Sequence, residues 1–122
     1  MAESQSDFER RLEAQVAALV ATEKFDIETV RELLILDCHS SPTARRFFEN
    51  HIDNQEILAV LIQLAIDDHS GDAQMNASYW ISRFSVGMLK AYITQLATIA
   101  SNEWDSVAVH ARKALEAVKA AS

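Results

Sequence analysis

The longest apolar stretch of the chain is Ile57–Ile66, in which Gln63 is the only polar residue. A helix that is apolar on every side has to be covered by other protein all round. The stretch is too short to cross a bilayer, which takes about 20 apolar residues at about 1.5 Å of rise each. We therefore predict that it forms the buried central helix of a small soluble domain.

Apolar residues recur at helical spacing along the rest of the chain, and no stretch alternates with a period of two over more than a few positions. Only two Gly and one Pro are present, which leaves few tight turns for a sheet. The sequence therefore predicts an all-α fold of seven helices. Residues suited to begin these helices are a capping box of Ser6 and Glu9, then Asp26, Ser41 before Pro42, Asp53 or Asn54, Asp72, Ser85, and the segment 102–105.

The chain also repeats itself at a distance of about 32 residues. This shift places Phe47-Phe48 on Tyr79-Trp80, and Gln63-Leu64-Ala65 on the identical Gln95-Leu96-Ala97. The repeated unit is a helix, a short polar turn and a second helix. We predict three units, at residues 26–52, 54–84 and 86–118, which follow an N-terminal capping helix at 6–23 within a single domain spanning residues 1–122.

Each unit reads as an apolar helix, a turn and a helix of small residues, as in Ile62–Asp67 followed by Asp72–Ala77. Over residues 26–118 this pattern resembles HEAT repeats, particularly the short HEAT-like units of phycobilisome lyase subunits. The Val-Arg pair that is usual in the second helix is only partly present, for example as Ala44-Arg45. The resemblance implies a short right-handed α-solenoid and a family that mostly binds proteins. A compact helical bundle would satisfy the same burial pattern and is the alternative.

Hydrophobic residues make up 49% and charged residues 24% of the 122 residues, which is typical of a globular domain. The net charge is −7, and residues 1–60 hold twelve acids against six bases. This excess of acids disfavours nucleic acids and anionic membranes as ligands. The negative charge either provides solubility or favours a basic protein partner. Cys38 has no second cysteine to pair with, and the first residues lack the pattern of a signal peptide, so we expect a cytoplasmic protein.

The second helix of each unit would line the concave side of such a solenoid. Phe47, Tyr79 and His110 occupy equivalent positions there, one step off the core stripe. Together with nearby cations they would form a groove with an aromatic centre, and Tyr and Arg are frequent anchors of protein interfaces. The alternative is that Phe47 and Tyr79 are core residues with one wet edge. The candidate partner-binding residues are Phe47, His51, Tyr79, Arg83, His110 and Arg112, with Arg46 and Ser82 nearby.

Catalytic and metal-binding patterns are weak in this sequence. His39 and His69 lie in equivalent turns close to acids, yet no His-Glu-x-x-His or paired-Cys spacing occurs. Adjacency of Cys38 and His39 does not by itself orient a nucleophile and a base. We therefore expect no catalytic residue, no metal and no cofactor. Trp104 either covers the open end of the helical stack or contacts a partner.

We therefore expect a non-enzymatic module that binds a protein partner on its concave face. The alternative is an acidic inhibitor or immunity-type protein that neutralises a basic toxin or enzyme. An enzymatic interpretation would require His39, His69 or Asp67 to converge in a pocket. The acids that motivate the inhibitor alternative are Glu9, Glu13, Glu23, Asp26, Glu28 and Glu32.

Overall fold

The computed structural model describes residues 3–121, and every regular element within this range is helical. The prediction of an all-α fold is confirmed. The elements are α1 (Gln5–Thr22), α2 (Ile27–Cys38), α3 (Pro42–Glu49), α4 (Gln55–Asp67), α5 (Gly71–Ile81), α6 (Val86–Leu89), the 3-10 helix η1 (Lys90–Tyr92), α7 (Ile93–Ala100) and α8 (Asp105–Ala120).

The sixth of the seven expected helices is interrupted and forms α6, η1 and α7. In one continuous α-helix, Ile93 would lie on the same side as Leu89 and Leu96. The 3-10 turn has three residues per turn and changes this phase, so Leu89 and Leu96 are buried while Ile93 is 42% exposed. Ile93 therefore does not face the core, where a single continuous helix would place it.

Most helices begin where the sequence predicts. The side chains of Asp26, Ser41, Asn54 and Ser85 each accept a hydrogen bond from the backbone N–H three residues later. Each cap satisfies one of the N–H groups that a helix start leaves without a partner. Pro42 follows the Ser41 cap as the first residue of α3, where a missing N–H costs nothing.

Two predicted caps are wrong. Ser4, not Ser6, caps α1 by accepting from Asp7 N at 3.1 Å, and Ser70, not Asp72, caps α5. Glu9 makes no capping box because its carboxylate accepts bonds from Ser41 Oγ at 2.9 Å and from Thr43 N at 3.1 Å. Glu9 therefore connects α1 to the start of α3. The two segments are about 32 residues apart in the sequence.

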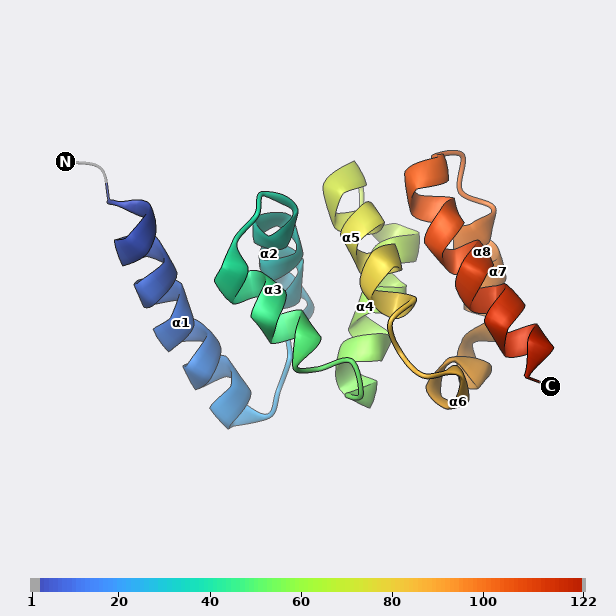
Figure 1. Ribbon diagram of the computed structural model, residues 1–122, viewed down its shortest axis with the longest axis horizontal. Helices are drawn as coiled ribbons and strands as arrows, with labels where there is room; N and C mark the ends of the chain where they lie inside the picture. Colours follow the sequence, from blue (N-terminus) through green and yellow to red (C-terminus); the bar gives the residue numbers. More distant parts are fainter. Residues whose placement is uncertain (1–2, 122) are drawn as a thin grey trace.

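Figure 1 shows the helices arranged as pairs that follow one another along the longest axis of the molecule. The pairs are α2 with α3, α4 with α5, and α7 with α8, and α1 precedes them at the N-terminal end. Helices α3, α5 and α8 face the viewer, whereas α2, α4 and α7 lie behind them. Helix α5 packs against α2, α4 and α8, so the middle pair contacts the pair on either side.

The hydrophobic core runs through all three pairs. Leu34 of α2, Leu61 of α4 and Leu96 of α7 have no exposed surface. Leu64 is also buried, so the predicted burial of the central helix is confirmed for these residues. Helix α4 is not covered all round, however. Ala59, Gln63 and Asp67, spaced four residues apart on one side, are exposed.

Helix α1 is attached more loosely than the others. Leu12 is its only buried residue among those described, and Phe8, Val16 and Leu19 are partly buried against the core. Polar contacts from Glu9 and from Glu13, whose carboxylate lies 2.9 Å from Arg46 Nη2, add to this packing. None of the described helices is long and apolar enough to cross a bilayer.

The substitution Leu61→Asp should prevent folding, because it places an unpaired carboxylate at a fully buried position. Such a group costs several kcal/mol, a large share of the about 5–15 kcal/mol that holds a typical domain folded. Far-UV circular dichroism and thermal unfolding would measure the loss. The matched control is Gln63→Asp, which adds the same charge at an exposed position of the same helix and should leave folding intact. Soluble, fully helical Leu61→Asp protein would contradict the prediction.

Candidate protein-binding site

Four of the six predicted partner-binding residues line two separate hollows. The α1–α3 hollow, of about 450 Å³, is lined by Glu13, Val16, Ala17, Val20, Thr43, Arg46, Phe47, Asn50 and His51. The α3–α5 hollow, of about 360 Å³, is lined by Arg45, Glu49, Ile52, Tyr79, Trp80 and Arg83. The structure therefore brings Tyr79 and Arg83 together and places Phe47 and His51 at the other hollow.

Phe47 is a core residue. Only 2% of its surface is exposed, because the rings of Phe25, Phe48 and His51 pack around it with centroids 5.9, 5.1 and 4.6 Å away. This burial agrees with the alternative that Phe47 is a core residue, and it leaves little of the ring for a partner to contact. His51 Nδ1 lies 2.6 Å from the Phe47 carbonyl oxygen, and the half-buried imidazole flanks the Phe47 ring.

Tyr79 is half-buried, unlike Phe47 at the equivalent repeat position. Its ring meets Trp80 and His110 edge-on, with centroids 5.0 and 5.5 Å apart. Its hydroxyl accepts a hydrogen bond from Arg45 Nη2 at 3.4 Å. Tyr79 thus has one side in the core and its polar end at the α3–α5 hollow, a distribution typical of tyrosine at binding surfaces.

His110 and Arg112 of α8 do not line the α3–α5 hollow. His110 lies against the far edge of Tyr79, and burial together with the charge of Lys113 lowers the pKa of its imidazole, so His110 is neutral at pH 7. Arg112 Nη1 lies 3.3 Å from Asp105 Oδ1 of the same helix, on the exposed surface. The cations that reach the α3–α5 hollow are Arg45 and Arg83.

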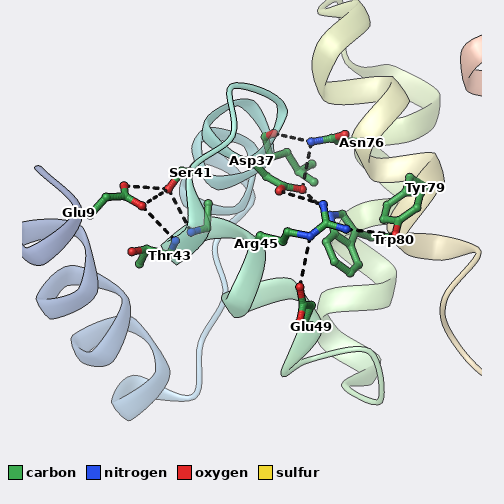
Figure 2. A network of polar contacts seen from close by, with 11 residues as sticks. Glu9, Asp37, Ser41, Thr43, Arg45, Glu49, Asn76, Tyr79 and Trp80 are labelled. Carbon is green, nitrogen blue, oxygen red and sulfur yellow. Dashed lines mark hydrogen bonds and ion pairs between the residues drawn. The ribbon is translucent and has the colours of Figure 1, made fainter. Parts of the chain in front are cut away.

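Sequence reasoning missed Asp37, which lies at the centre of a polar network beside the hollow (Figure 2). Only 8% of its surface is exposed. Its Oδ2 accepts hydrogen bonds from Trp80 Nε1 at 2.8 Å and from Asn76 Nδ2 at 3.2 Å, both on α5. An available signal was its position three residues after Leu34, on the buried side of α2. Its donors lie about 40 residues further on, beyond the reach of sequence spacing.

Burial raises the pKa of the Asp37 carboxyl, and the hydrogen bond from Trp80 and the charge of Arg45 oppose that rise without cancelling it. The Asp37 carboxylate in turn holds Arg45, whose Nη1 lies 3.8 Å from Asp37 Oδ1. The Arg45 guanidinium lies over the Trp80 ring at 5.5 Å and within 3.3 Å of a Glu49 carboxylate oxygen. Arg45 is therefore fixed at the hollow by contacts on several sides.

Arg83 follows the end of α5 and is exposed. Among the residues that the structure describes, its guanidinium forms no ion pair and no hydrogen bond. The α3–α5 hollow thus contains one guanidinium that is engaged internally, one that is not, and a single lining acid, Glu49.

Charge is distributed unequally between the two layers of helices. The front layer of α3, α5 and α8, with the turn after α5, holds six basic residues against four acids. The helices α2, α4 and α7 of the rear layer, together with η1, hold two basic residues against five acids, one of which is Asp37, whose carboxylate lies beside the α3–α5 hollow. The front residues are Arg45, Arg46, Arg83, Arg112, Lys113 and Lys119 against Glu49, Asp72, Asp105 and Glu116. The rear residues are Arg31 and Lys90 against Glu28, Glu32, Asp37, Glu56 and Asp67.

The described residues contain no group of three or more His, Cys, Asp or Glu side chains that could hold a metal ion. His39 Nε2 lies 3.7 Å from Asp72 Oδ2, in an exposed pair between α2 and α5. Burial and the nearby Asp72 raise the pKa of the Cys38 thiol, which keeps it protonated at pH 7. Neither residue has the environment of an activated nucleophile or base.

Trp104, which precedes α8, packs against the start of α5 and is partly exposed. Its ring lies on the first residue of α5, so that a Cβ added at Gly71 would come within 3.0 Å of its Cζ3 atom. The indole covers that helix start with one side and remains 46% exposed. Gly71 is needed here for the close approach of a neighbouring ring, not for an unusual backbone conformation.

Comparison with protein-family models, with curated proteins and with solved structures gave no match.

The substitution Asp37→Asn should change how stability depends on pH. Because burial raises the pKa of Asp37, the folded protein binds a proton there more tightly than the unfolded chain. The stabilisation from this group is complete below the ordinary pKa of an aspartate and is lost as pH rises through the raised value. Wild-type stability should therefore fall relative to Asp37→Asn over that interval. Urea unfolding of both proteins at a series of pH values would measure this difference in the free energy of unfolding. Parallel curves of stability against pH for the two proteins would contradict the prediction.

Proposed function

We propose that this protein is a short right-handed α-solenoid of three HEAT-like hairpins with α1 as its N-terminal cap, and that it is a non-enzymatic protein-binding module. The three helix pairs correspond to the predicted units at 26–52, 54–84 and 86–118. Its partner contacts the front layer of helices at the α3–α5 hollow.

The order of the helix pairs supports the solenoid over a compact bundle. Helix α5 packs against α2 of the preceding pair and α8 of the following one. In a compact bundle the first and last helices would share one core, whereas α1 and α8 lie at opposite ends of the longest axis (Figure 1). Stacked hairpins of this kind bury their apolar sides mainly against their immediate neighbours.

The observation that carries the proposed function is the composition of the α3–α5 hollow. Tyr79, Arg45 and Arg83 line it together, and Tyr and Arg are among the residues that contribute most to protein interfaces. Arg45 is held in place before any partner arrives, which reduces the entropy that binding has to overcome. The Arg83 guanidinium has no polar contact to give up among the residues that the structure describes.

An inhibitor or immunity-type protein that binds a basic partner is the second candidate. Glu23, Glu28 and Glu32 remain exposed near the N-terminal end of the molecule. Three other acids of that group are engaged internally, since Glu9 binds the start of α3, Glu13 contacts Arg46 and Asp26 caps α2. Fewer free acids therefore remain to bind a basic partner than the sequence suggests. For this reason the inhibitor is the second candidate.

Charge reversal at the hollow tests the first candidate. Tagged wild type and the variants Arg83→Glu and Lys90→Glu would be used to capture proteins from native lysate, with quantification by mass spectrometry. Lys90 is an exposed cation of the rear layer, so its reversal is the matched control. We expect wild type and Lys90→Glu to retain the same proteins, and Arg83→Glu to lose them by about tenfold or more. Equal capture by all three would overturn the proposed site.

A second variant separates binding from folding. Tyr79→Ala should remain helical and cooperative in thermal unfolding, because the ring is only half-buried, while capture falls as it does for Arg83→Glu. Collapse of the Tyr79→Ala protein would instead make Tyr79 a core residue. If capture depends on Glu28 and Glu32 and falls steeply with salt, the partner is basic and the second candidate replaces the first.

A further inference from the structure

We infer that the α3–α5 hollow receives an acidic peptide segment of the partner, with a side-chain carboxylate of that segment held between Arg45 and Arg83. The inference deepens the proposed function and rests on it. It names the chemistry of the bound segment at the same site.

Arg45 presents its guanidinium in a fixed orientation. Asp37 lies 3.8 Å behind it, the Tyr79 hydroxyl accepts from its Nη2 at 3.4 Å, and the Trp80 ring lies 5.5 Å away on one face (Figure 2). The Asp37 carboxylate is buried and bonded to Trp80 and Asn76, so it stays in place. Because Nη1 is directed at Asp37 and Nη2 at Tyr79, the Nε–H that faces Glu49 is the donor through which this guanidinium can bind a further carboxylate.

Glu49 shows that a carboxylate fits against Arg45 from the hollow side. Its Oε1 lies 3.3 Å from Arg45 Nε, one helical turn away on α3. Both side chains of this pair are about half exposed, and exposed pairs of this spacing contribute little to stability. A carboxylate from a partner can therefore replace Glu49 at Arg45 at little cost to the fold.

Arg83 supplies the second half of the binding pair. It lines the same hollow and is exposed, and its guanidinium has no polar partner among the residues that the structure describes. With Glu49 displaced, the hollow would hold two guanidinium groups, of which Arg45 is already paired with the buried Asp37, and no lining acid. A carboxylate is the group that this arrangement favours.

The wider charge distribution supports an acidic segment at this face and opposes a basic one. The front layer of helices, which carries the hollow, holds more bases than acids, whereas the rear layer holds more acids than bases. At physiological salt, charges are screened over about 8 Å, so the groups at the hollow, Arg45 and Arg83 against Glu49 and the buried Asp37, count for more than the net charge of the whole protein. Once Glu49 is displaced, the two arginines face only the Asp37 carboxylate, so an acidic segment can bind here even though the protein carries −7.

The rest of the hollow favours a peptide over a small free anion. Ile52, Tyr79 and Trp80 provide an apolar and aromatic wall beside the cations. The volume of about 360 Å³ exceeds what a single carboxylate fills and lies in the range of about 300–1,000 Å³ that ligand sites occupy. A peptide segment that carries a carboxylate and a neighbouring apolar side chain matches both the cations and the apolar wall of the hollow.

A titration followed by NMR tests this assignment on the full chain. The probe is the peptide Ac-Ala-Glu-Leu-Glu-Ala-NH2, and its matched control replaces both Glu residues by Gln. The observed signals are Nε–H of Arg45 and Arg83 and the indole Nε1–H of Trp80, and saturation up to about 5 mM peptide covers the weak affinities expected of a short segment. We expect the acidic peptide to shift these signals and the amide peptide to leave them unchanged.

Two substitutions should change the affinity in opposite directions. Arg83→Gln should weaken the acidic peptide by about tenfold, because it removes the unengaged cation. Glu49→Gln should strengthen it several-fold, because the internal competitor for Arg45 is gone. Lys90→Gln, which removes a cation of the rear layer, should leave the affinity unchanged. Absence of shifts, equal shifts with the amide peptide, or equal weakening by Arg83→Gln and Lys90→Gln would overturn the inference.

The two proposals fail in different ways. If Arg83-dependent capture of a partner persists while the acidic peptide gives no shift, the bound segment is not acidic and only the present inference falls. If capture does not depend on Arg83, the proposed function itself falls.

Discussion

The contact on which the candidate site depends is the hydrogen bond between the buried carboxylate of Asp37 and the indole of Trp80. A buried carboxylate is costly unless donors surround it, and here Trp80, Asn76 and Arg45 do so from two other helices. The same contact joins the first helix pair to the second and fixes Arg45 above the Trp80 ring. One buried polar group thereby links the packing of the helices to the chemistry of the surface.

Packing of helix pairs against their neighbours determines the rest of the architecture. A helical hairpin has one apolar side that it cannot bury alone, so each pair stabilises the next. The middle helix α4 holds the longest apolar stretch, and α5, its partner, contacts helices of both adjacent pairs. At the N-terminal end α1 covers the first pair with one buried leucine and a few polar contacts, so we expect this end to open more readily than the middle.

Equivalent positions of the repeat have different roles in the structure. Phe47 is enclosed by aromatic rings from three other residues, whereas Tyr79 has a polar end at the surface and His110 covers its edge. A repeat pattern predicts that these residues share a face of the second helices. It does not predict how deeply each residue is buried, because burial depends on the neighbouring helix. Phe47 of α3 lies beside α1, whereas Tyr79 of α5 lies beside α3, and α1 and α3 are not copies of each other.

The sequence by itself determined the helices, most of their first residues and the burial of Leu61, because helix caps and apolar spacing act over three or four residues. Only the tertiary structure decided that Glu9 binds α3 instead of capping its own helix, that a 3-10 turn exposes Ile93, and that Asp37 meets Trp80. These outcomes depend on groups brought together from about 30 to 40 residues away, or on how the neighbouring helices pack. Local pattern carries no information about such distances, and the candidate site, made from α3 and α5, is of this second kind.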